Sequence, residues 1–547
     1  MSRNWLKIAG GTLGVGILLI MLFANQLGLD NNPVWGVKRY LIFFVGLLIL
    51  AVSVFHREEN FIGQAFNTHT GQLYLASGLL GAFILLIYIW FTSIGLWTVW
   101  PNETSYYDLL ASAFRNGDLA LGVKPDPALL TLENLYEPGS REGIPMLWDA
   151  TLYKGKYYLY WGPAPALFLA IIKLFYEEPI GDKVITFAFA AGTLLFTFLL
   201  ILEIWKRYFT EIPRWAVLAG MAFAGLVNPI LFILIEGRIY EAAIIAGQFF
   251  LIGGLYWLVT GFIRPSSPRI FMAGLFFALA VGSRTTLTPA VAVLSLVLFL
   301  WAVKSQRGKA LPFITTFALP LILGAVCYAW YNYARFDSFT EFGYRYQLTS
   351  YNLYESLDET FSLSYIPPNV YKTLFNPLER RVTFPYFFPT RWVGPDWLAN
   401  GNYPKFYLLL AEGITGIFIA SPFMFFAFLA ALNKNKDFRW IAISLAGSAF
   451  SIFFMLQIFF FTTMRYMLDL IPTLSLLAVA GFWQGLIRFK DRPIVRRILI
   501  MAGLVLLLYS IAISLLLPVS GHLESFRVFN PELLKNMTWI INNIIPK

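Results

Sequence analysis

The stretch Pro101-Asn102-Glu103-Thr104-Ser105-Tyr106-Tyr107-Asp108 follows an apolar run that ends near Trp100, and it begins the only long polar interval in the first half of the chain. Almost all of the sequence on both sides is compatible with a membrane interior. In so apolar a chain, carboxylates beside helix ends need a functional or structural reason, because ionisable groups are costly next to lipid. We therefore expect this stretch to mark the functional site, and the rest of the chain to build that site or hold it at the membrane surface.

The composition is that of a polytopic membrane protein. Of the 547 residues, 58% are hydrophobic and only 13% are charged. The net charge of +10 does not indicate nucleic-acid binding, because the Lys and Arg residues lie at the ends of apolar runs and not in one basic segment. Cys327 is the only cysteine, which excludes a disulfide framework and a thiolate metal site. The histidines His56, His69 and His522 are too scattered to favour a His-based metal site or triad.

Apolar runs of about 18 to 25 residues are long enough for a helix to cross a hydrocarbon core of about 30 Å. The candidate spans lie near 8–28, 37–55, 73–99, 183–204, 214–235, 240–262, 269–283, 286–303, 310–331, 405–431, 438–461, 464–487 and 496–517. A shorter run, 161–175, is interrupted by Gly162, Pro163 and Pro165, so we expect it to form an interfacial or re-entrant helix. The predicted fold is thus an all-α polytopic membrane protein with about thirteen transmembrane helices and interfacial helices in long outer loops.

The basic residues predict the orientation of these helices. When the spans alternate from a cytoplasmic N-terminus, every short loop with several Lys or Arg residues falls on one face, as the positive-inside rule requires. The C-terminus is then outside. Arg3 and Lys7 precede an apolar run without a convincing cleavage site, so we expect a retained first span.

Two carboxylates of the opening stretch are candidate catalytic groups. Glu103 lies in a loop at the top of an apolar helix, where it is well placed to take a proton from a hydroxyl nucleophile. Asp108 also has a structural explanation, because Ser105 to Asp108 matches a capping box in front of a helix over 109–115.

A second constellation is the turn Glu236-Gly237-Arg238-Ile239-Tyr240-Glu241 between two predicted spans. Arg238 lies on the outer side, against the positive-inside trend, which favours an anionic ligand such as a phosphate. Glu241 falls in the first turn of the next helix, where the helix dipole alone would also favour an acid.

Further arginines lie in a polar break between apolar runs, in the second outer interval 332–404 and at the outer end of a late span. Arg284 lies in the polar break 282–286 and needs a cavity or an acidic partner, so it is a candidate phosphate ligand. Arg345 and Arg465 are similar candidates, although Arg465 and Asp469 are four residues apart and could simply pair along a helix.

These residues resemble motifs of the GT-C superfamily of membrane glycosyltransferases, especially the branch of protein O-mannosyltransferases and aminoarabinose transferases. That branch begins its first outer loop with a Pro-Asp-Glu-Thr-x-Tyr-like motif, followed by a short helix that ends in Gly-Asp and by an aromatic interfacial helix. The corresponding residues here are Pro101-Asn102-Glu103-Thr104-Ser105-Tyr106, Asn116-Gly117-Asp118 and Tyr160-Trp161-Gly162-Pro163. The likeness extends over roughly residues 75–330, with the acidic loop Glu236 to Glu241 and the break at Arg284.

The resemblance implies an inverting single displacement on the outer face of the membrane, here the bacterial inner membrane. The donor would be a sugar on a polyprenyl phosphate, and the acceptor a glycan, lipid or protein. Glu103, helped by Asp108, would deprotonate the acceptor. The predicted ligands of the leaving phosphate are Arg238 and Arg284 first, and Arg345 and Arg465 second. No cofactor is required, although Glu236 and Glu241 could hold a divalent metal.

The resemblance also predicts a division of the chain. Residues 1–72 would form two extra helices, 73–331 the GT-C-like catalytic module with a first outer loop over 100–182, 332–404 an aromatic outer loop, and 405–547 the last spans and an outer tail.

One departure keeps other functions open. The family's catalytic Asp falls on Asn102, which cannot accept a proton at neutral pH. Either a neighbouring acid has taken its role or the activity is lost. A transporter or flippase of lipid-linked sugars is the alternative from another class, although we find no internal repeat of the kind many transporters have.

Overall fold

The computed structural model describes residues 3–22, 24, 35–55, 69–410, 412–521 and 523–544, and the chain forms two compact units, 1–101 and 102–547. The first unit contains α1 (Arg3–Leu22), α2 (Val37–Phe55) and α4 (His69–Thr92). Helices α1 and α2 pack closely, since a Cβ atom added to Gly14 would lie 2.7 Å from the backbone nitrogen of Leu50. The predicted boundary at residue 72 stays a prediction, and parts of the run 8–28 lie outside the described residues.

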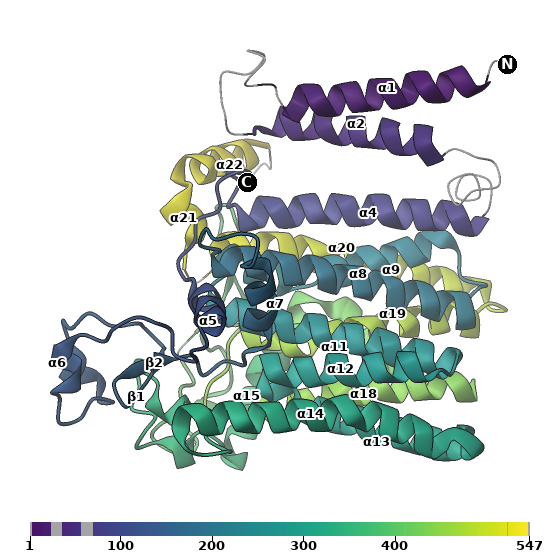
Figure 1. The fold of residues 1–547 in the computed structure, drawn as a ribbon. Coiled ribbons are helices and arrows are strands. Elements are labelled where there is room, and N and C mark those ends of the chain that lie inside the picture. The colour runs from purple at the N-terminus through teal and green to yellow at the C-terminus, as the bar shows by residue number, and fades with distance from the viewer. Residues whose placement is uncertain are drawn as a thin grey trace. The chain divides into compact units, whose positions relative to one another are not determined.

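The second unit is a bundle of long helices joined at alternate ends (Figure 1). Its long helices are α8 (Asp182–Tyr208), α9 (Arg214–Leu226), α11 (Ile239–Ile263), α12 (Ser267–Ser283), α13 (Thr288–Ser305), α14 (Ala310–Phe336), α18 (Lys436–Gln457), α19 (Ile471–Arg488) and α20 (Pro493–Leu516). The short helix α10 (Ile230–Glu236) continues the candidate span that α9 begins. Helix α11 is buried along most of its length, so it forms the centre of this bundle.

Within the described ranges, nine helices are long and apolar enough to cross a membrane. The all-α polytopic fold is therefore supported, while the predicted number of thirteen spans is not confirmed. One clear departure is the run 405–431, whose helices in the described residues are α17 (Ile417–Ala420) and the 3₁₀ helix η7 (Pro422–Leu432). Gly413, Gly416 and Pro422 interrupt this run, and such residues weaken or end helices even where the composition is apolar.

Shorter elements gather mainly in the connections at one end of the bundle, where Figure 1 shows α5, α6, α7, α15 and the strands β1 and β2. They are α5 (Tyr106–Arg115), α6 (Pro127–Leu130), η1 (Pro138–Arg141), α7 (Ala164–Ile172), η4 (Tyr344–Tyr346), η5 (Leu357–Glu359), η6 (Leu363–Tyr365), α15 (Ile366–Phe375), α16 (Asp396–Ala399), η8 (Arg465–Asp469), η9 (Leu517–Ser520), α21 (Ser525–Phe529) and α22 (Pro531–Ile544), with η2 (Thr285–Leu287) before α13 and η3 (Arg307–Lys309) before α14. Two antiparallel hairpins pair β1 (Thr151–Tyr153) with β2 (Lys156–Tyr158) and β3 (Leu378–Arg380) with β4 (Phe387–Pro389). Helix α7 has only nine residues and is too short to span, as predicted.

The predicted capping box at Ser105 is wrong, because Ser105 makes no side-chain cap. The buried carboxylate of Asp182 caps α5 instead and accepts from the backbone nitrogens of Tyr106 at 3.0 Å and Tyr107 at 3.2 Å. The hydroxyl of Thr104 donates to Asp182 at 2.6 Å and accepts from the Ile239 nitrogen at 3.0 Å. The opening stretch thereby joins the beginnings of three helices, α5, α8 and α11.

Candidate functional site

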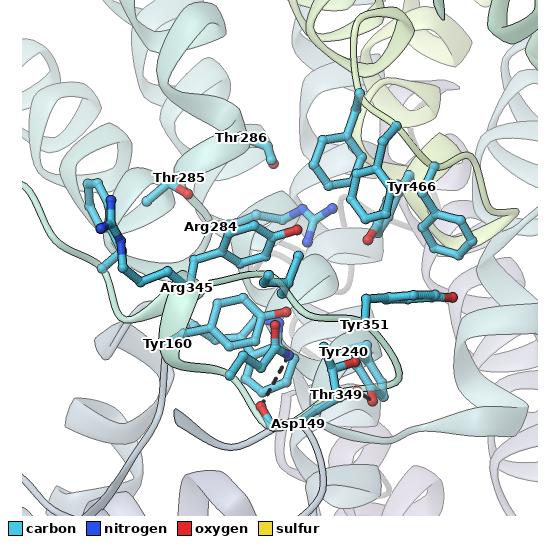
Figure 2. A pocket seen from close by; sticks show the side chains of 18 of the residues that line it. Asp149, Tyr160, Tyr240, Arg284, Thr285, Thr286, Arg345, Thr349, Tyr351 and Tyr466 are labelled. Carbon is cyan, nitrogen blue, oxygen red and sulfur yellow. Dashed lines mark hydrogen bonds between the residues drawn. The ribbon is translucent and has the colours of Figure 1, made fainter. Parts of the chain in front are cut away.

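A cavity of about 610 Å³ lies at the loop-rich end of the second unit (Figure 2). Its main charged and polar side chains are Asp149, Tyr160, Arg238, Tyr240, Arg284, Thr285, Thr286, Glu341, Tyr344, Arg345, Gln347, Thr349, Tyr351, Glu412, Arg465 and Tyr466. Another part of the wall is apolar and comes mainly from the end of α18 and the segment after it, with Met455, Leu456 and Phe459 to Phe461. The cavity thus combines an ionic side with a hydrocarbon-like side.

All four arginines that the sequence predicted as phosphate ligands line this cavity. Arg238 lies in the turn between α10 and α11, and Arg284 in the break between α12 and η2. Arg345 belongs to η4 and Arg465 to η8. Four segments that are distant in the sequence therefore converge, while the binding of a phosphate by these side chains stays a prediction.

Arg284 is fixed from one side only. Its Nε lies 2.7 Å from Oδ2 of Asp469, which is fully buried, and the ring of Tyr466 lies 5.1 Å from the guanidinium carbon. Neither terminal nitrogen of Arg284 makes a hydrogen bond to any residue that the structure describes. The two-pronged end of this arginine is available to a ligand in the cavity.

Arg238 and Arg465 have a different environment, because each is held by two carboxylates. Nη2 of Arg238 lies 3.3 Å from Oε2 of Glu236, and its Nε lies 3.7 Å from Oε2 of Glu241. Nη1 of Arg465 lies 3.4 Å from Oε1 of the same Glu241, and Nη2 of Arg465 pairs with Oε1 of Glu412. Glu241 is in the first turn of α11, as predicted, and its carboxylate accepts from the Arg238 backbone nitrogen at 2.9 Å.

The predicted alternative in which Arg465 pairs with Asp469 is wrong, because Asp469 pairs with Arg284. Both residues lie in η8, a 3₁₀ helix with about three residues per turn. Side chains four residues apart therefore point in different directions, whereas an α-helix would place them on one face.

Sequence reasoning missed Asp149. This residue is only 6% exposed and has a left-handed backbone with φ of 59°. Its Oδ2 accepts a hydrogen bond from the Tyr240 hydroxyl, and its buried Oδ1 accepts none from the described part of the chain. Burial raises the pKa of the Asp149 carboxyl from 3.8 to about 6, although Thr349, Arg465 and Arg238 act in the opposite direction. The sequence feature that could have identified this residue is an acid among the apolar residues around Trp148.

The two predicted catalytic acids do not line the cavity. Glu103 is exposed and lies within electrostatic range of Lys183. Asp108 is buried, pairs with Lys173 at 2.8 Å and accepts from the Ile180 nitrogen at 3.0 Å, so it ties α5 to the segment after α7. The catalytic roles of Glu103 and Asp108 stay predictions.

The predicted metal ligands Glu236 and Glu241 face arginines. Among the residues covered by the structure, no group of three or more His, Cys, Asp or Glu side chains is arranged to hold a metal ion. The suggested divalent metal therefore stays an untested prediction.

A second cavity of about 720 Å³ lies along α18, beside residues that precede those lining the first cavity. Met455 and Leu456 line the first cavity, and Phe450 and Phe453 line the second. Its walls come from η7, α18 and α19 and are almost entirely apolar. We call this second cavity the apolar groove.

No family model matches the chain, and no curated protein matches it. Among solved structures, the chain is similar to the apo form of an oligosaccharyltransferase from Archaeoglobus fulgidus, with 13% identity and a TM-score of 0.46. That similarity covers 88% of this chain and 59% of the other, so the chain spans about three fifths of that protein's length.

Proposed function

We propose that this chain is a membrane glycosyltransferase that moves a sugar from a polyprenyl-phosphate donor to an acceptor hydroxyl. One observation carries the proposal: a buried carboxylate with a raised pKa, Asp149, shares a cavity with Arg284, whose terminal nitrogens have no partner among the described residues. A raised pKa suits a general base that works near neutral pH. An arginine fork suits a phosphate.

Arg284 is the first phosphate ligand in this proposal. Asp469 holds its Nε, so the guanidinium is already oriented before the donor arrives. Preorganised donors of this kind stabilise charge that develops in a transition state without further reorganisation. Arg345, which Glu341 holds through Nε at 3.0 Å, is the second candidate.

The balance of charge favours a donor with one phosphate over a diphosphate. Four arginines line the cavity, and each pairs with at least one carboxylate. The site therefore lacks a large excess of positive charge and must recognise its ligand by directed hydrogen bonds. A phosphodiester with a single negative charge suits such a site better than a diphosphate with two.

Asp149 is the base in this proposal, in preference to the exposed Glu103. Figure 2 shows Asp149 and Tyr240 on one side of the cavity and Arg284 with Thr286 on another side. A sugar between them would have the acceptor and the phosphate on opposite faces of its anomeric carbon. The acceptor oxygen bonds to that carbon as its proton passes to Asp149, and the bond to phosphate oxygen breaks with its electron pair. One displacement of this kind inverts the anomeric configuration.

The apolar groove supports a lipid carrier. It lies along the predicted membrane span α18, whose next residues line the cavity, so a hydrocarbon chain attached to the phosphate could extend along this helix into the groove. The basic connections around Arg207, Arg264, Arg307, Lys434 and Arg488 lie at the other end of the bundle from the cavity. By the positive-inside rule, the cavity then faces the outer side of the bacterial inner membrane.

The test is transfer by the purified protein in liposomes. Polyprenyl-monophosphate and polyprenyl-diphosphate sugars would be offered with candidate glycan, lipid and peptide acceptors, and products would be identified by mass spectrometry. We expect a glycoside from monophosphate donors. Movement of the donor across the bilayer without any product would favour the flippase.

A further inference from the structure

Tyr240 contacts both ionic parts of the cavity wall at once. It is the second residue of α11, and its hydroxyl donates to Oδ2 of Asp149. The guanidinium carbons of Arg238 and Arg465 lie 5.2 Å and 4.9 Å from the centre of its ring. Trp161 contacts the same ring edge to face, with centroids 5.3 Å apart. Its ring is therefore fixed by three side chains while its hydroxyl holds the carboxylate.

The neighbours of Tyr240 are fixed as well. Glu241, the next residue, is fully buried and pairs with both Arg238 and Arg465. If both arginines turned away, they would leave a buried carboxylate unpaired, which is strongly unfavourable. Tyr240 is thus held in one orientation by a helix terminus, two fixed cations and one indole ring.

We propose that Tyr240 is a positioning residue for the transfer reaction, which holds Oδ2 of Asp149 and so fixes the orientation of this carboxylate toward the acceptor hydroxyl. The inference rests on the proposed function, because it assigns a role toward the same base. The atom Oδ1 of this carboxylate is buried. A donor to the other oxygen stabilises the carboxylate form and keeps the base ionised at lower pH.

Few other groups can produce a pH dependence here. The charged or titratable side chains that act on Asp149 are Tyr106, Arg141, Tyr160, Arg238, Tyr344, Tyr351 and Arg465. Burial raises the pKa of the four tyrosines above the ordinary value of 10, and arginines remain charged. The transition of Asp149 is therefore identified as the one near pH 6 that disappears in Asp149→Asn.

The test compares Tyr240→Phe with Tyr136→Phe. The hydroxyl of Tyr136 donates to the Leu152 carbonyl at 3.0 Å, outside the cavity lining, so this control loses a hydrogen bond without touching Asp149. In Tyr240→Phe we expect kcat to fall by roughly 10-fold or more, with little change in KM for the donor and with the acidic limb of the pH profile at higher pH. In Tyr136→Phe the acidic limb of the pH profile should lie at the same pH as in the native protein.

An infrared titration of the Asp149 carboxyl, identified by subtracting Asp149→Asn, needs no activity and should show the same displacement to higher pH. If the native protein transfers no sugar, the proposed function fails. The titration would still show whether Tyr240 lowers the pKa of the Asp149 carboxyl. If Tyr240→Phe does not fold, 3-fluorotyrosine at the same position provides a stronger donor and should move the titration to lower pH. An unmoved carboxyl titration in the folded variant, or a loss confined to donor KM, would overturn the inference.

Discussion

Replacing Asp149 by Asn should make the protein more stable and far less active. Burial raises the pKa of this carboxyl from 3.8 to about 6, so the folded protein at pH 7 holds a charge that its surroundings disfavour. At roughly 1.4 kcal/mol per pH unit, the ionised group costs up to about 3 kcal/mol of folding free energy. Asn carries no charge, and its oxygen can still accept from Tyr240. Turnover should meanwhile fall by roughly 10²- to 10⁴-fold, because the amide cannot take a proton.

The gain in stability should depend on pH in a defined direction. A folded-state pKa above the unfolded value means that the folded protein binds the proton more tightly. The native protein therefore carries the penalty above about pH 6 and loses it progressively as the pH falls toward 3.8, where both states become protonated. The excess stability of Asp149→Asn should be largest near neutral pH and should disappear near about pH 4.

Thermal unfolding of the purified proteins across this pH range provides the assay, together with the rate of sugar transfer. Asp337→Asn is the matched control, because Asp337 is exposed and its pKa is lowered by the hydrogen bond from Lys154. That exchange should give no increase in Tm at neutral pH. The reasoning is refuted if Asp149→Asn unfolds at a lower Tm than the native protein at neutral pH, or if it retains native turnover.

Three further predictions concern the phosphate site, the competing acid and the orientation. Arg284→Lys should bind the donor roughly 10-fold more weakly in a donor titration, because Lys keeps the charge but loses the guanidinium fork. Arg284→Ala should bind it more weakly still, and equal affinities in all three proteins would contradict the role of Arg284 as a phosphate ligand. Glu103→Gln should keep nearly native turnover because Glu103 is exposed outside the cavity, and a well-folded but inactive variant would return the role of base to Glu103. In a Cys327→Ser background, a cysteine at Gly139 should react with an impermeant thiol reagent added outside, and one at Ser305 should not; the opposite labelling would reverse the orientation.

The sequence predicted the membrane fold and the four arginines of the cavity wall for the same reason. Apolar runs must span or be buried, and an arginine within such sequence needs a cavity or an acid. That reasoning found Arg238, Arg284, Arg345 and Arg465, which line one cavity. It failed for the run 405–431, because hydropathy does not distinguish a membrane helix from apolar sequence interrupted by Gly and Pro.

Partners of the charged groups could not be predicted, because they depend on tertiary contacts. Asp182 caps α5 from the start of α8, and no local pattern connects it with the residues around Ser105. Asp469 pairs with Arg284, across 185 positions, although Arg465 is far nearer in sequence. Asp149 differs from other loop acids only in its burial, which the fold creates.

The central claim is that Asp149 serves as the base for sugar transfer from a lipid phosphate. It is tested most directly by the anomeric configuration of the product made by native and Asp149→Asn protein in the same liposomes, with donor binding measured in parallel. We predict an inverted glycoside from the native protein and none above background from the variant, with donor binding preserved in both. A product of retained configuration, or native transfer rates in Asp149→Asn, would contradict the account.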